Sequence, residues 1–180
     1  MLRYITGRGG SGTGGLSAYL KTLDDDYDVL PIDAEFLQHD IQGQIDTVRE
    51  FILLDTASVV ANSYGAYLLL LALIDQPPSN IRVLLLSPVL GRAISEERML
   101  FSRPPREKTL HQAIIEKRLG MPDRLEIVTG QEDEICDSAL ARQVGEQLGI
   151  SISILPNEGH MLSPQLVSAT LKRFQAGVPP

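Results

Sequence analysis

The chain has 180 residues, of which 43% are hydrophobic and 22% charged, a composition typical of one globular domain with a sizeable core. Its formal net charge of −7 argues against a nucleic-acid-binding protein, because such proteins normally carry a basic face. The single cysteine, Cys136, excludes an intrachain disulfide and favours a reducing compartment. We therefore expect a single domain over residues 1–180.

Short apolar segments alternate with helix-forming segments along the chain. The apolar segments lack a clear two-residue period, which is typical of parallel strands covered by helices on both faces. The sequence predicts strands over residues 2–6, 27–32, 57–62, 81–87, 125–129 and 151–155. It predicts helices over residues 15–22, 41–53, 64–75, 137–148 and 164–174.

Two features of the apolar segments bear on the location of the protein in the cell. The first predicted strand begins at residue 2, which leaves no room for a signal peptide before it. The longest apolar run, residues 66–74, is much shorter than the roughly 20 residues that a membrane span needs. We expect a cytoplasmic protein that does not contact a membrane.

A glycine-rich loop follows the first predicted strand. Residues 7–12 satisfy the Gly-x-Gly-x-x-Gly pattern of dinucleotide-binding domains, and Asp33 follows the second strand, where such domains have a ribose-binding acid. A Rossmann-like nucleotide-binding protein that uses the loop Gly7 to Gly12 and Asp33 is therefore one hypothesis. A P-loop is excluded, because Thr13 occupies the position of its phosphate-binding lysine.

The third predicted strand runs directly into a helix-forming segment, and Ser63 stands at the junction. A sharp strand-to-helix turn with a serine at its apex and small residues two positions to either side is a nucleophile elbow. Gly65 meets this size requirement, and Ala61 stands where the usual Gly-x-Ser-x-Gly pattern has its first glycine. The sequence thus predicts Ser63 as a nucleophile. The competing interpretation is that Ser63 only caps the helix that follows.

Two later strands end beside residues that can activate a serine. Asp133 follows the fifth predicted strand and His160 follows the sixth. A serine hydroxyl is a poor nucleophile at neutral pH and needs a base such as imidazole within hydrogen-bonding reach. A carboxylate then fixes the tautomer of that imidazole. The chain order of Ser63, Asp133 and His160 is that of α/β-hydrolases, and differs from the orders in chymotrypsin and subtilisin.

With these motifs the chain resembles the α/β-hydrolase superfamily, specifically its compact single-domain branch of small bacterial esterase-like serine hydrolases. The resemblance spans nearly the whole chain and rests on Asn62-Ser63-Tyr64-Gly65, the Gly130-x-x-Asp133 turn, Gly159-His160 and the glycine-rich loop. It implies a three-layer α/β fold with a mostly parallel six-stranded sheet in the order 2-1-3-4-5-6. The sheet of the superfamily usually begins with two further strands, and we expect the first strand here to correspond to the third of that sheet.

The resemblance also implies an activity. It predicts cleavage of a carboxylic ester, or a related thioester or amide, through an acyl-enzyme, with Ser63, Asp133 and His160 as the catalytic residues. The oxyanion hole is expected to consist of the backbone N–H groups of Tyr64 and Arg8. The usual His-Gly motif of that loop is replaced here by Thr6-Gly7. The expected partner is a small-molecule acyl substrate, and the expected oligomeric state is a monomer or a homodimer.

Residues 91–122, between the fourth and fifth predicted strands, are the one long departure from the alternation. The resemblance implies a small cap or lid here, and the sequence predicts a helix over residues 107–119 within it. Residues 92–124 contain eight of the sixteen Lys and Arg residues and five acidic residues, which leaves this segment at +3. A basic cap would attract an anionic substrate. Alternating charges are equally the ordinary pattern of a solvated helix face.

Other assignments of the site stay open. Asp137 is an alternative acid if Asp133 caps the following helix, and an acid on an earlier strand also occurs in the superfamily. His39 and His111 lie in polar surroundings, and Cys136 has no neighbouring histidine, so it is expected to pack as a small apolar residue. The sequence contains no cluster with metal-ligand spacing, and we expect neither a metal nor a cofactor.

Overall fold

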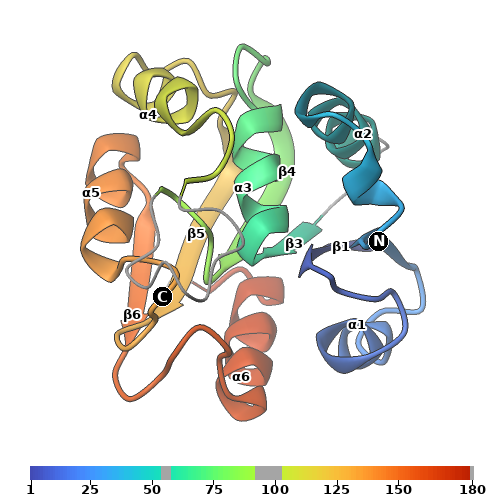
Figure 1. Cartoon of the computed structure of the whole chain (residues 1–180). Coiled ribbons are helices and arrows are strands. Elements are labelled where there is room, and N and C mark those ends of the chain that lie inside the picture. Colours follow the sequence, from blue (N-terminus) through green and yellow to red (C-terminus); the bar gives the residue numbers. More distant parts are fainter. Residues whose placement is uncertain (54–57, 92–102, 179–180) are drawn as a thin grey trace.

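The structure is a computed structural model that describes residues 1–53, 58–91 and 103–178 (Figure 1). In chain order its elements are β1 (Leu2–Arg8), α1 (Gly15–Lys21), β2 (Tyr27–Ile32), η1 (Phe36–Gln38), α2 (Ile41–Leu53), β3 (Ser58–Asn62), α3 (Ser63–Ala72), β4 (Ser79–Leu86), α4 (Glu107–Ile115), β5 (Pro122–Gly130), α5 (Ser138–Leu148), β6 (Ser151–Leu155) and α6 (Pro164–Gln175). The predicted alternation of strands and helices is confirmed. The short 3-10 helix η1 was not predicted.

The six strands form one sheet in the order β2-β1-β3-β4-β5-β6, as the sequence predicts. All five pairings between these strands are parallel. The chain turns from β1 outward to β2 and then returns to β3 on the other side of β1. Open sheets of this kind bind ligands at such a switch point, outside the carboxyl ends of the strands. The glycine-rich loop after β1 and Ser63 after β3 both lie there.

Helices cover both faces of the sheet and make a three-layer fold. Figure 1 shows α1 and α6 on one side of the sheet, and α2, α3, α4 and α5 on the other. Successive residues of β3 accordingly enter different cores: Val59 and Ala61 pack with α3, and Val60 packs with α6. Because both faces are buried, apolar residues occur on both sides of the strands, which explains the missing two-residue period.

The central helix α3 is buried from Tyr64 to Ala72. The apolar run behind Ser63 is therefore a core helix, as expected, and it brings its first turn to the carboxyl end of β3. Among the described helices, none is long and apolar enough to cross a membrane.

The helix predicted over residues 107–119 is wrong at its end, because α4 stops at Ile115. Lys117 has a φ of 56°, in the left-handed region, and turns the chain back toward α3, where Leu119 pairs with Ile74. β5 then begins at Pro122, three residues before the predicted start and at the last residue of the predicted cap. The other predicted boundaries lie within three residues of the observed ones. Residues 92–102 of the predicted cap and Ala57 of the third predicted strand lie outside the described residues.

Candidate active site

Ser63 occupies the turn between β3 and α3 in a strained conformation. Its φ of 51° lies in the left-handed region, which residues other than glycine rarely adopt. The turn packs tightly against the end of β1, since a Cβ atom on Gly65 would lie 2.2 Å from the carbonyl oxygen of Thr6. Asn62 precedes α3, and no side chain makes a capping hydrogen bond at this helix end. The conformation is that of the predicted elbow, and Ser63 does not cap the helix.

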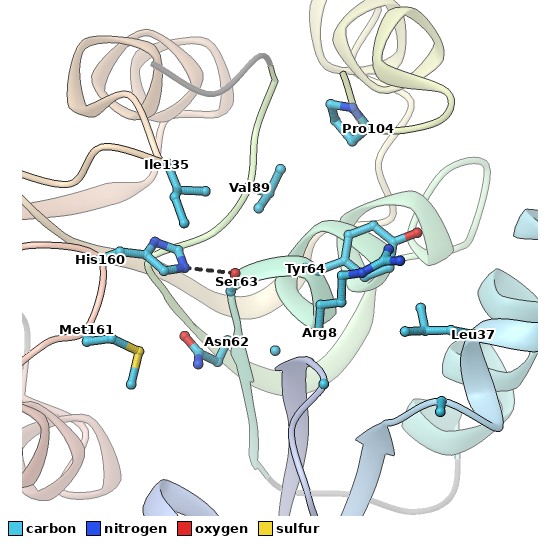
Figure 2. A pocket seen from close by; sticks show the side chains of 13 residues that line it. Arg8, Leu37, Asn62, Ser63, Tyr64, Val89, Pro104, Ile135, His160 and Met161 are labelled. Atoms are coloured by element: carbon cyan, nitrogen blue, oxygen red, sulfur yellow. Dashed lines mark hydrogen bonds between the residues drawn. The ribbon is translucent and has the colours of Figure 1, made fainter. Parts of the chain in front are cut away.

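The structure brings Ser63, His160 and Asp133 together from the ends of β3, β6 and β5. The Nε2 atom of His160 lies 2.9 Å from Oγ of Ser63 (Figure 2). The other ring nitrogen, Nδ1, lies 3.0 Å from both Oδ1 and Oδ2 of Asp133. The imidazole therefore bridges the hydroxyl and the carboxylate, which is the arrangement that serine nucleophiles need for activation.

The carboxylate of Asp133 is buried and held by several donors. Its Oδ1 atom accepts the backbone N–H groups of Ile135 and Cys136, each at 2.8 Å, and the Thr129 hydroxyl donates to Oδ2 at 3.3 Å. Burial alone would raise the pKa of Asp133, but the hydrogen bond from His160 and those from the two amides outweigh it and hold the pKa below its ordinary value. Asp133 is therefore an anion at neutral pH, facing the imidazole.

The alternative acid, Asp137, has a different role. Its Oδ1 atom accepts the backbone N–H groups of Ala139 at 2.8 Å and Leu140 at 3.4 Å, which makes it the N-cap of α5. Among the described residues the carboxylate that contacts His160 is that of Asp133.

Gly130 allows the two loops that carry Asp133 and His160 to meet. A Cβ atom at this position would lie 2.1 Å from the carbonyl oxygen of Glu158, a contact that no side chain tolerates. The same carbonyl accepts the backbone N–H of Glu132 at 2.9 Å. The loop after β6 thus lies directly on the loop after β5, and this contact sets the distance between the carboxylate and the imidazole.

The glycine-rich loop passes close to Ser63 at the start of α3. The N–H of Tyr64 belongs to the first turn of α3, where backbone donors have no acceptor within the helix and the helix dipole is positive. On the other side, Gly7 passes so close that a Cβ there would lie 3.2 Å from Cβ of Ser63. The N–H of Gly9 donates to Ile32 on β2. Arg8 is the last residue of β1, and successive peptide groups of a strand point in opposite directions.

A cavity of about 550 Å³ opens above Ser63. Most of its wall is apolar, and Figure 2 shows the side chains that form it. The lining residues are Gly7, Arg8, Gly9, Ala34, Leu37, Asn62, Ser63, Tyr64, Val89, Pro104, Ile135, His160 and Met161. The sequence did not predict that the side chains of Arg8 and Leu37 line this cavity. Leu37 belongs to η1, which was not predicted, and Arg8 lines the wall because it packs over Tyr64.

A second cavity of about 380 Å³ lies on the other side of His160, between α1 and α6. It shares Asn62, His160 and Met161 with the first cavity. Its remaining lining is almost wholly apolar: Gly15, Leu16, Tyr19, Leu86, Leu162, Pro164 and Val167. This cavity could not be predicted from the sequence, because α1 and α6 are far apart along the chain and neither carries a motif.

Other residues considered from the sequence serve the fold. Asp33 accepts the N–H of Phe36 at 3.0 Å at the start of η1, and His111 Nε2 lies 2.6 Å from the carbonyl oxygen of Leu90. Cys136 is buried, and burial raises the pKa of its thiol to about 12, so it is not a nucleophile at neutral pH. In the described part of the chain no group of His, Cys and acidic residues could hold a metal ion.

Several solved structures are similar to this chain over nearly its whole length. Among solved structures, the ydeN gene product of B. subtilis is similar over 97% of this chain and 98% of its own, with 19% identity and a TM-score of 0.68. A monoacylglycerol lipase of Paleococcus ferrophilus is similar over 97% of this chain and 93% of its own, with 12% identity and a TM-score of 0.68. Est1E of Butyrivibrio proteoclasticus is similar over 98% of this chain and 86% of its own, with 15% identity and a TM-score of 0.68. These similarities establish the α/β-hydrolase fold.

The sequence itself identifies the family. No curated protein sequence matched the chain. Residues 33–169, about three quarters of the chain and including Ser63, Asp133 and His160, match the family described as Serine hydrolase. This match favours a serine hydrolase over a nucleotide-binding protein. The protein is an enzyme with the α/β-hydrolase fold, and it belongs to the Serine hydrolase family.

Proposed function

We propose that the protein cleaves carboxylic esters, or related thioesters or amides, through an acyl-enzyme on Ser63. The observation that carries this proposal is the hydrogen-bonded series from Ser63 through His160 to the buried Asp133. The family membership supports it, since serine hydrolases share a serine nucleophile. The esterase and the lipase among the similar structures support an ester as the substrate.

The geometry supports a two-step mechanism. In the first step, Nε2 of His160 takes the Ser63 proton while Oγ forms a bond to the acyl carbon. Asp133 stabilises the imidazolium that results. The imidazolium then gives its proton to the departing alcohol, thiol or amine, and the acyl group remains on Ser63. In the second step, a water molecule loses its proton to His160 and attacks the acyl carbon. The bond from Oγ of Ser63 to that carbon then breaks, the acid leaves, and His160 returns the proton to Oγ.

The developing oxyanion needs two donors, and we assign these to the backbone N–H groups of Tyr64 and Arg8. The assignment is supported by the position of Tyr64 at the start of α3 and by the Gly9 N–H, which donates toward β2, since the preceding N–H of a strand points the opposite way. Donors placed where charge develops act most strongly in a site that excludes water.

Replacing Arg8 with proline removes one of these donors. We expect turnover of p-nitrophenyl acetate to fall by two to three orders of magnitude, since one oxyanion donor contributes about 3 kcal/mol of transition-state stabilisation. Steady-state kinetics measure the effect. Circular dichroism of the variant must confirm that the turn has not unfolded, because full turnover by a well-folded Arg8→Pro protein removes Arg8 from the oxyanion hole.

An acyl-enzyme has a kinetic signature. Rapid mixing with p-nitrophenyl acetate is expected to release a burst of nitrophenol of about one equivalent per active chain, followed by slower steady turnover. Mass spectrometry of the acid-quenched protein should find the acetyl group on the peptide that contains Ser63. Steady hydrolysis with neither a burst nor an acetylated Ser63 would contradict the covalent mechanism.

We also propose that residues 91–122 act as a small cap over the first cavity. Pro104 contributes to the cavity wall, and the hydroxyl of Tyr67 donates to the carbonyl oxygen of Pro105 at 2.5 Å.

The single cysteine, buried and unpaired, supports a cytoplasmic location. A monomer or homodimer remains our expectation.

A further inference from the structure

The two edges of the sheet differ in how they are protected. β2 and β6 are the outer strands, so each has one side without a partner strand in the described sheet. β2 contains Pro31, which has no backbone N–H, and the exposed Asp28, whose carboxylate accepts the N–H of Val29 at 2.9 Å. Proline and charged residues are the usual protection of a sheet edge against pairing with another chain. β6 contains neither, since its five residues are Ser-Ile-Ser-Ile-Leu, and it is the edge that remains open to pairing.

The backbone of β6 presents its free hydrogen-bonding groups at two isoleucines. The carbonyl oxygen of Leu155 accepts the N–H of Gln131 at 2.8 Å, so the polar backbone groups of Leu155 face β5. Since these groups point to opposite sides in successive residues of a strand, those of Ile152 and Ile154 face the open edge.

The length of β6 limits how a second strand can pair with it. Pro156 follows the strand, and Gly149 precedes it with a φ of 68°, in the left-handed region. An antiparallel pairing of two β6 strands that uses all five residues has its two-fold axis at Ser153. Ile152 of one strand is then opposite Ile154 of the other, and the two residues can exchange both of their backbone hydrogen bonds.

The open edge adjoins a hollow of about 470 Å³ between β6 and α5. Ile152 and Ile154, both half-buried, contribute its apolar part. Arg142 and Glu146 of α5 line it as well, and both are exposed. Their spacing of four residues places the two charges on one face of the helix. Within the part of the chain that the structure describes, neither charge has an ion-pair partner.

The charged pair and the centre of β6 lie at nearly the same height. Gly145 rests directly on Ile152, because a Cβ atom there would lie 2.2 Å from Cγ1 of that side chain. A short turn joins α5 to β6, so the two elements run in opposite directions. From this contact, Ser153 is about 3.3 Å along the strand, and Val144, midway between the two charges, is about 1.5 Å along in the same direction. A two-fold axis at Ser153 therefore also brings Arg142 of one α5 opposite Glu146 of the other.

We propose that β6 is the interface of a homodimer, in which a second copy of this chain pairs antiparallel with β6 about a two-fold axis at Ser153. The two sheets become one continuous sheet, and the ion pair between Arg142 and Glu146 forms twice. A second copy fits this edge because the surface is complementary to itself, with one charge of each sign placed symmetrically about the axis, as an isologous interface requires. The proposal does not depend on the proposed function.

Sedimentation velocity of the full chain tests the dimer, which we expect at micromolar concentration. Arg142→Glu places two acidic residues opposite each other on both sides of the axis, and Glu146→Arg places two basic residues there. Each change should raise the dimer dissociation constant at least tenfold, because like charges then face each other twice in the interface. A wild-type chain that stays monomeric, or a dimer that neither change weakens, overturns the proposal.

Exchanging the two charges separates loss of the interface from loss of the fold. The double variant Arg142→Glu, Glu146→Arg restores both ion pairs and should dimerise within a few fold of the wild-type affinity. An equimolar mixture of the two single variants should form a heterodimer for the same reason. Lys21→Glu is the matched control, since it reverses an exposed charge on α1, which contacts β1 and β2, and should leave the dimer intact. Failure of both the double variant and the mixture to dimerise, or loss of the dimer in Lys21→Glu, contradicts the assignment.

Hydrogen exchange measured by NMR locates the interface on the backbone. The amides of Ile152 and Ile154 should exchange at least tenfold more slowly in the wild-type dimer than in the monomeric Arg142→Glu variant, because the dimer pairs both of them. Equal exchange rates of these two amides in a wild-type dimer and in the monomeric variant would place the interface elsewhere and overturn the pairing through β6.

Discussion

Replacing Ser63 with alanine is expected to lower kcat for p-nitrophenyl acetate by roughly a million-fold, the scale seen when the nucleophile of a serine hydrolase is removed. The reason is that the hydroxyl 2.9 Å from Nε2 of His160 is the atom that attacks the acyl carbon in the proposed mechanism. Steady-state kinetics with enough protein to detect slow turnover measure the effect.

Ser87→Ala is the matched control for this experiment. Ser87 is fully buried at the end of β4, and it also has a positive φ, 44°, so the change has the same chemistry in a similar backbone conformation. We expect this variant to keep turnover within a few fold of the wild-type rate. Near-normal turnover in Ser63→Ala, or its loss in Ser87→Ala, would show that the nucleophile has been misassigned.

Asp133→Asn should lower kcat by roughly ten-thousand-fold, because an amide no longer holds His160 in the correct tautomer or stabilises the imidazolium. The lowered pKa of Asp133 means that the wild-type residue is ionised throughout the neutral range, so the charge is lost completely in the variant. Turnover of p-nitrophenyl acetate measures the loss, and circular dichroism checks that the fold is retained.

Asp137→Asn provides the comparison, since Asp137 follows the same strand and caps α5. Asparagine caps helices about as well as aspartate, so this variant should keep both its stability and its turnover. If Asp137→Asn lost activity and Asp133→Asn kept it, the acid would have to be reassigned.

The fold and the elbow could be predicted from the sequence because their signals are local. A strand without a two-residue period indicates burial on both faces, and the alternation of such strands with helices indicates a parallel sheet. The elbow is visible because its backbone leaves room only for small residues: a Cβ atom on Gly65 would lie 2.2 Å from the carbonyl oxygen of Thr6. His160 could be singled out because it directly follows the last strand of the sheet.

The sequence predicted Asp133 as the acid but could not exclude Asp137. Both residues follow β5 within one short loop, and each is a suitable partner for a helix start or for an imidazole. The structure separates them by the direction of their carboxylates, one toward His160 and the other toward the first turn of α5. Spacing along the chain carries no information on that direction.

Features made by contacts between distant segments were also beyond the sequence. The end of α4 depends on the left-handed turn at Lys117 and on the pairing of Leu119 with Ile74. The packing of Arg8 over Tyr64 joins β1 to α3, and the apolar cavity joins α1 to α6. None of these contacts leaves a pattern in a single segment.

Labelling with a fluorophosphonate tests the central claim most directly, because the reagent reacts with activated serines and requires no knowledge of the substrate. Ser63 is expected to be the modified residue in the folded protein, identified by mass spectrometry of its peptide. His160→Ala should greatly slow the reaction, since it removes the base 2.9 Å from Oγ of Ser63. Modification of Ser58 or Ser87 with Ser63 untouched would contradict the account.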